Sequence, residues 1–76
     1  MPSLADMREG QSAKVIEITG NDSIATRLME MGLTDGESIQ LIGFAPMGDP
    51  LEISIRGYRL SLRKIEAQRV LVDFSE

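Results

Sequence analysis

Apolar and polar side chains alternate in several short segments of this chain, and this period of two predicts β-strands. The clearest case is residues 51–56, where three aliphatic residues alternate with Glu, Ser and Arg. The same alternation recurs over 37–44, 59–63 and 69–74, and glycine, proline or aspartate interrupts the chain between several of these segments. Short alternating segments with such punctuation are typical of all-β folds.

A further strand is predicted over Ala13–Ile18, but its pattern is irregular. Ala13 and Val15 share one face, whereas Ile16 and Ile18 fall out of phase with them. A β-bulge would shift the phase, and burial of both faces would give the same pattern. The sequence leaves both explanations open.

One amphipathic helix is predicted over residues 23–31. Ile24, Leu28 and Met31 recur at i, i+4 and i+7, which places them on one helical face. Gly32 then occupies the position where a left-handed residue commonly ends a helix. This helix lies between the first two predicted strands.

The remaining local patterns predict turns. Residues 3–7 are expected to form one helical turn, and residues 65–67 a short turn that places Ile65 in the core. Gly57 and Tyr58 are expected to form the tight reversal of a hairpin, because glycine supplies the positive φ that such a turn needs. Residues 43–50 read as an irregular loop with two prolines and two glycines.

Together these elements predict a mainly β fold, in which a small five-stranded barrel has one α-helix inserted between its first two strands. Closure into a barrel is expected because it removes the exposed edges of a sheet. The 76 residues suggest one domain spanning 1–76. The predicted core consists of Ala13, Val15, Ile18, Leu28, Met31, Leu33, Ile39, Leu41, Leu51, Ile53, Ile55, Leu60, Leu62, Ile65, Val70 and Val72.

Charge is distributed unevenly along the chain. The net charge is −4, but residues 56–69 carry five basic side chains and one acidic side chain. This predicts one basic surface on an otherwise acidic protein, either an ordinary solvated face or a docking face for an acidic partner. An acidic protein is repelled by phosphate backbones, so we expect no nucleic-acid binding.

The composition argues against most catalytic and metal chemistry. The chain has no cysteine and no histidine, which excludes disulfides and Cys/His zinc sites. Gly43 and Gly48 have the spacing of a phosphate-binding loop, but Asp49 and Pro50 stand where that loop needs Lys and Ser or Thr. We therefore expect no enzyme activity and no cofactor, and at most weak binding of a divalent metal.

Several apolar residues are not needed by the predicted core and are candidates for partner binding. Phe44 and Met47 belong to the irregular loop, Tyr58 lies at the hairpin tip, and Met29 lies off the main helical face. Methionine and tyrosine are frequent at binding surfaces. The alternative is that the loop folds over the barrel end and completes a small core of its own.

Four sequence blocks, read together, resemble the FeoA family of small proteins in bacterial ferrous-iron transport. They are Gly-x-x-Ala-x-Val from Gly10, Arg-Leu-x-x-Met-Gly-Leu from Arg27, Ala-Pro-x-Gly-Asp-Pro-Leu from Ala45, and Arg-Gly-Tyr-x-Leu-x-Leu-Arg from Arg56. The resemblance covers the chain from about residue 4 to 72. It implies an SH3-like barrel and an accessory role toward FeoB, a membrane Fe²⁺ transporter with a cytoplasmic G-protein domain.

From the residues and this resemblance we expect a non-enzymatic accessory protein that binds the cytoplasmic part of a FeoB-type transporter. The alternative is a metal-responsive sensing domain like that of iron-dependent repressors. The N-terminus has no signal-peptide pattern and no segment is long enough to span a membrane, so we expect a cytoplasmic monomer. The predicted contact residues are Arg27, Phe44, Met47, Arg56, Tyr58 and Arg59.

Arg27 has two alternative roles. It lies on the predicted helix beside the apolar face, where it could pair with Asp35 or Asp49 and hold the helix to a loop. Otherwise, Arg27 contributes directly to the docking surface.

Overall fold

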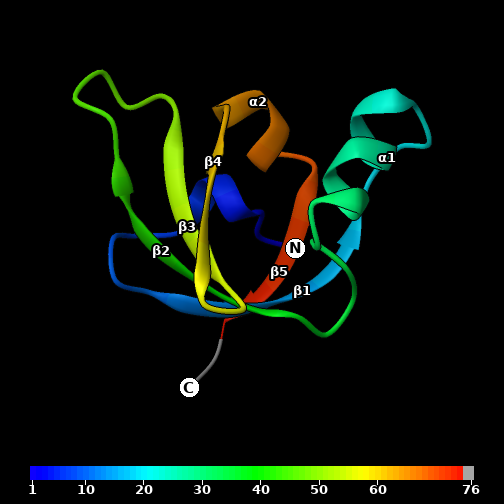
Figure 1. The fold of residues 1–76 in the computed structure, drawn as a ribbon, viewed down its shortest axis with the longest axis horizontal. Helices are drawn as coiled ribbons and strands as arrows, with labels where there is room; N and C mark the ends of the chain where they lie inside the picture. The colour runs from blue at the N-terminus through cyan, green and yellow to red at the C-terminus, as the bar shows by residue number, and fades with distance from the viewer. Residues whose placement is uncertain (75–76) are drawn as a thin grey trace.

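A computed structural model of the protein describes residues 1–74 and shows a five-stranded antiparallel sheet with three short helical elements (Figure 1). This confirms the predicted mainly β fold with one helix between the first two strands. The elements, in chain order, are a 3₁₀ helix Leu4–Asp6, β1 Ser12–Ile18, α1 Ser23–Glu30, β2 Ser38–Phe44, β3 Leu51–Ile55, β4 Tyr58–Leu62, α2 Lys64–Ala67 and β5 Val70–Phe74.

The strands follow the order β4-β3-β2-β1-β5, so β4 and β5 are the two ends of the sheet. The N-terminal segment lies along β5, where Val72 N–H donates to the Pro2 carbonyl at 3.0 Å and Ser3 bridges Leu71. The edge of β5 is thus covered by the N-terminal segment. Within the described residues, β4 pairs with β3 alone.

The irregular pattern of the first strand is explained by a β-bulge. The register of β1 against β5 shifts between Val15 and Glu17. Because the bulge adds one residue to the strand, Ile16 and Ile18 are turned partly out of the core, while Ala13 and Val15 are buried.

Helix α1 begins at Ser23 as predicted and ends at Glu30, one residue before the predicted end. The Asp22 carboxylate caps the first turn by accepting from Ala25 N–H at 3.2 Å. At the other end Gly32 has φ +105°, and Leu33 N–H donates back to the Leu28 carbonyl at 3.2 Å. This is the Schellman arrangement that a glycine after a helix favours.

The hairpin between β3 and β4 turns one residue earlier than predicted. Arg56 and Gly57 form the two-residue loop, with φ values of 51° and 83°, and Tyr58 is already the first residue of β4. Two successive positive φ values are those of a type I′ turn, whose twist matches that of the flanking strands.

The core agrees with the prediction at most positions, with one error and four omissions. Ile65 is 68% exposed, because the single turn of α2 directs Glu66 and Ala67 inward instead. Ile18, Met31 and Leu60 are only partly buried against the core. The buried residues that the prediction lacks are Leu4, Met7, Ala25 and Ala67.

Candidate docking surfaces

The residues predicted for partner binding do not form one patch. Strand β3 separates the β2–β3 loop, at the upper left of Figure 1, from the hairpin turn at the bottom of the view. Five residues of strand span roughly 16 Å. Phe44 and Met47 therefore lie at one end of the sheet, and Arg56 and Tyr58 at the other.

At the hairpin end, the predicted residues make contacts within the chain. The Arg56 guanidinium pairs with Glu37, which lowers the pKa of that carboxyl below its ordinary value and raises the pKa of Arg56. The Tyr58 hydroxyl donates to the Met31 carbonyl at the end of α1, at 2.8 Å. Arg59 is more loosely held, with a nitrogen 3.7 Å from a Glu52 oxygen. Arg56 and Tyr58 thus have a structural role at this end.

The loop end presents apolar side chains to solvent. Met47 is 92% exposed, and Phe44 is about half as exposed, so Met47 does not contribute to the small core considered as an alternative. The loop is anchored by Asp49, whose carboxylate accepts from Lys64 N–H at 2.9 Å. This bond brings the loop next to α2, which carries the exposed Ile65.

Arg27 pairs with neither of the predicted carboxylates. Its guanidinium contacts Glu66 on α2, and the other Glu66 oxygen accepts from Arg63 N–H at 2.9 Å. Glu66 is 8% exposed, the most buried acidic side chain of the described residues. The prediction that Arg27 pairs with Asp35 or Asp49 is wrong. Both carboxylates belong to loops, whereas Arg27 lies in the last turn of α1, which faces α2.

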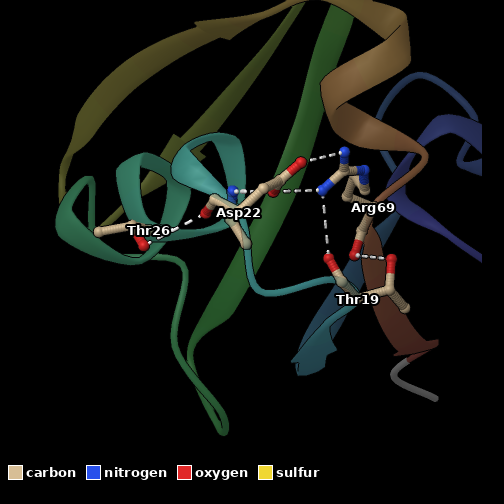
Figure 2. Close-up of polar contacts among 5 residues, drawn as sticks. Thr19, Asp22, Thr26 and Arg69 are labelled. Atoms are coloured by element: carbon tan, nitrogen blue, oxygen red, sulfur yellow. Dashed lines mark hydrogen bonds and ion pairs between the residues drawn. The ribbon is translucent and has the colours of Figure 1, made fainter.

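A second ion pair holds the N-terminus of α1 to the start of β5 (Figure 2). Here the residue on the α1 side is acidic and its partner is basic, the reverse of the first pair. The two terminal nitrogens of Arg69 lie 2.8 Å from the two carboxylate oxygens of Asp22. Arg69 also donates to the Thr19 carbonyl at 3.4 Å, and Thr19 N–H donates to the Arg69 carbonyl at 2.8 Å. The Arg69 guanidinium and the Ala25 amide together hold the pKa of Asp22 well below its usual range.

An apolar groove, which was not predicted from the sequence, lies between β1 and α1. It encloses about 430 Å³, and its apolar lining consists of Ile16, Ile18, Met29 and Leu33. Glu17 and Asp35 also line it, so the groove has an acidic rim. The out-of-phase isoleucines and the off-face methionine were visible in the sequence, but only the fold brings them together.

The described residues contain no cluster of three or more His, Cys, Asp or Glu side chains arranged to hold a metal ion. None of the helices within residues 1–74 is long and apolar enough to cross a bilayer.

Comparison with known proteins places this arrangement in a family. Residues 3–73 match the FeoA domain. The chain belongs to the FeoA family. A curated FeoA-containing relative from Porphyromonas gingivalis is an "Fe(2+) transport protein A/Fe(2+) transporter FeoB fusion protein", 30% identical over 70 residues. The alignment covers 92% of this chain but only 8% of that relative.

Solved structures of other FeoA proteins have the same fold. The FeoA-like protein of Clostridium acetobutylicum is 40% identical and superposes with a TM-score of 0.89, over 95% of this chain and 84% of its own. Stenotrophomonas maltophilia FeoA, solved with zinc and described as a prokaryotic SH3 domain protein, is 35% identical with a TM-score of 0.85, over 96% and 91%. The fold of this FeoA chain is accordingly SH3-like.

The FeoA fold also occurs in a larger regulator. A manganese-dependent transcriptional repressor superposes with a TM-score of 0.89 over 97% of this chain and 36% of its own, at 17% identity. At that identity the likeness concerns the fold alone.

Proposed function

We propose that this chain is a non-enzymatic accessory protein of ferrous-iron uptake that binds the cytoplasmic part of a FeoB-type Fe²⁺ transporter. The observation that carries the proposal is membership of the FeoA family, together with a relative that joins a FeoA part to the transporter in one polypeptide. In the fusion protein the covalent link keeps the FeoA part at a high effective concentration near the transporter part. When FeoA and the transporter are separate chains, a binding interface is needed to keep them together.

The groove between α1 and β1 suits such an interface best. Met29 and the two out-turned isoleucines expose apolar surface there, and exposed apolar clusters mark interaction sites. The acidic rim of Glu17 and Asp35 complements the excess of Lys and Arg that cytoplasmic segments next to membrane spans carry. Ion pairs hold α1 to α2 and to the start of β5, so the position of α1, and with it the groove, is set before the partner arrives.

A test is the uptake of radioactive Fe²⁺ by cells of the source bacterium that lack this protein. Expression of the unaltered chain is expected to restore uptake, whereas Met29→Glu, which places a charge in the groove, is expected not to. Met47→Glu is the matched control, because Met47 is the more exposed methionine and lies outside the groove. Uptake that is unaffected by loss of the protein would contradict the proposed function. If Met29→Glu restored Fe²⁺ uptake, the groove would be excluded as the contact surface, but the proposed function would stand.

A response to divalent metal is the second candidate function, supported by the zinc-bound Stenotrophomonas maltophilia relative. A metal that binds only the folded chain raises its stability by RT ln(1 + [L]/Kd). Titration with Fe²⁺, Mn²⁺ and Zn²⁺ would then raise the thermal midpoint of unfolding. A midpoint that stays constant for all three ions would contradict metal sensing.

A further inference from the structure

The two end strands of the sheet differ in how their outer edges are covered. The N-terminal segment occupies the edge of β5 through the hydrogen bond between Val72 and Pro2. Strand β4 has no corresponding neighbour among residues 1–74. An uncovered strand edge presents unpaired main-chain groups on which another strand can be built.

The register identifies which main-chain groups of β4 are free. The two-residue turn makes Ile55 and Tyr58 the closing hydrogen-bonded pair, and antiparallel pairs then alternate between bonded and non-bonded. The amide and carbonyl groups of Arg59 and Ser61 therefore point away from β3. Both residues are exposed, and no hydrogen bond from a turn, loop or helix cap within residues 1–74 uses these groups.

The side chains along this edge form a charged pattern on the outer face of the sheet. Every second residue from Arg59 to Arg63 lies on this face, which gives the order Arg59, Ser61 and Arg63. Arg63 follows the last residue of β4, but its backbone is still extended, with φ −68° and ψ 149°. The Arg59 side chain is 64% exposed and has one distant carboxylate partner. Arg63 has no carboxylate within 4.0 Å in the described part of the chain. The edge thus places a small residue between two exposed cations.

A hollow of about 210 Å³ opens on the same face beside Ser61. Its lining is mainly apolar, from Gly43, Phe44, Ala45, Pro50 and Leu51, but it includes Glu52, the residue that pairs with Ser61 across β3 and β4. In strand addition, main-chain bonds give affinity, and pockets for alternate side chains give specificity. Along β4 the outward main-chain groups of Arg59 and Ser61 supply the first part, and the exposed side chains of Arg59 and Arg63 on either side of Ser61 supply the specificity through charge.

We propose that β4 binds an extended, acidic segment of a partner protein as an added antiparallel strand. Its carboxylates would face Arg59 and Arg63, and an apolar side chain between them, at the position opposite Ser61, would pack against Ser61 at the β4 side of the hollow. The pattern recognised is acidic-x-apolar-x-acidic. This goes beyond the proposed function, because it assigns a second binding surface and does not require the transporter.

The probe is the peptide acetyl-Thr-Glu-Thr-Leu-Thr-Glu-Thr-amide, titrated into the isotope-labelled full chain and followed by amide chemical shifts. We expect saturable shifts centred on Arg59 and Ser61. The same peptide with lysines in place of the glutamates is expected to bind about tenfold more weakly, equivalent to about 1.4 kcal/mol. No saturable shift on β4 at millimolar peptide, or equal binding of both peptides, would overturn the proposal.

Two controls separate main-chain pairing from general attraction. Methylation of the central leucine nitrogen removes the amide that faces β4 and should abolish binding, whereas methylation of a neighbouring threonine nitrogen should be tolerated. In the protein, Ser61→Pro removes an outward amide, whereas Ser61→Val keeps it, and thermal unfolding checks that both fold. Equal loss from both methylated peptides, or self-association of the chain in sedimentation experiments that Ser61→Pro abolishes, would contradict the assignment.

Discussion

The Arg69 guanidinium makes a bidentate contact with the Asp22 carboxylate, across 47 positions of sequence. Asp22 is also the N-cap of α1, so one carboxylate both starts the helix and attaches it to β5. Together with the Arg27–Glu66 pair, this contact fixes α1 near both of its ends, through an acidic residue at the N-terminus and a basic residue in the last turn. The orientation of the α1 groove therefore depends on polar contacts as well as on the buried Ala25 and Leu28.

The Asp22–Arg69 pair predicts an acid-sensitive part of the stability. The folded-state pKa of Asp22 is lowered, so its contribution is complete above the unfolded pKa of about 3.9 and is lost as the pH falls toward the folded value. Asp22→Asn keeps a capping side chain but removes the charge. Urea unfolding should show the variant less stable than the parent at pH 7 and the difference smaller at pH 3. Asp35→Asn, at an exposed turn, is the control, and a pH-independent difference for Asp22→Asn would contradict the prediction.

The contact between α1 and α2 predicts energetic coupling between Arg27 and Glu66. Arg27→Ala and Glu66→Gln, made singly and together, should be non-additive by at least about 0.5 kcal/mol in the free energy of unfolding. Glutamine retains an oxygen for the Arg63 amide, so the cycle isolates the charge pair. Glu30, three residues from Arg27 on the same helix, provides the comparison cycle. Equal coupling in the two cycles would mean that α2 is not the partner.

The structure predicts a steric clash between the Tyr58 hydroxyl and any side chain introduced at Gly32. Tyr58→Phe removes the bond to Met31 and should cost about 0.5–1.5 kcal/mol in stability. A Cβ on Gly32 would lie 2.9 Å from that hydroxyl and would occupy a φ of +105°. Gly32→Ala should therefore be less harmful in a chain that already carries Tyr58→Phe than in the parent. Thermal unfolding of the four proteins measures this, and an unchanged effect would leave backbone strain as its whole cause.

Elements whose structure is decided by one local pattern were predicted correctly from the sequence. Period-two alternation located β2, β3 and β4, and helical spacing with Gly32 located α1 and its end. Prediction failed where burial depends on contacts from distant segments. The N-terminal turn buries Leu4 although no periodicity marks it, and the inward face of a single helical turn such as α2 has no signature that excludes Ile65. The groove was missed for the same reason, because β1 and α1 contribute its residues separately.

The corrected core predicts opposite outcomes for two similar residues. Leu4 is fully buried, so Leu4→Ala should cost about 2–5 kcal/mol in unfolding free energy. Ile65→Ala should change it by no more than about 0.5 kcal/mol, because that side chain is largely exposed. Chemical denaturation of the two variants checks both values. Comparable losses would show that Ile65 is buried as the sequence first suggested.

The most direct test of the central claim is a calorimetric titration of this protein into the purified cytoplasmic G-protein domain of its cognate transporter. The titration is repeated with a GTP analogue and with Fe²⁺, to learn whether either ligand is required, and with Met29→Glu to locate the surface. We predict saturable binding that Met29→Glu weakens and Met47→Glu does not. The absence of binding under every condition, confirmed with the intact transporter in detergent, would contradict the accessory role proposed for this chain.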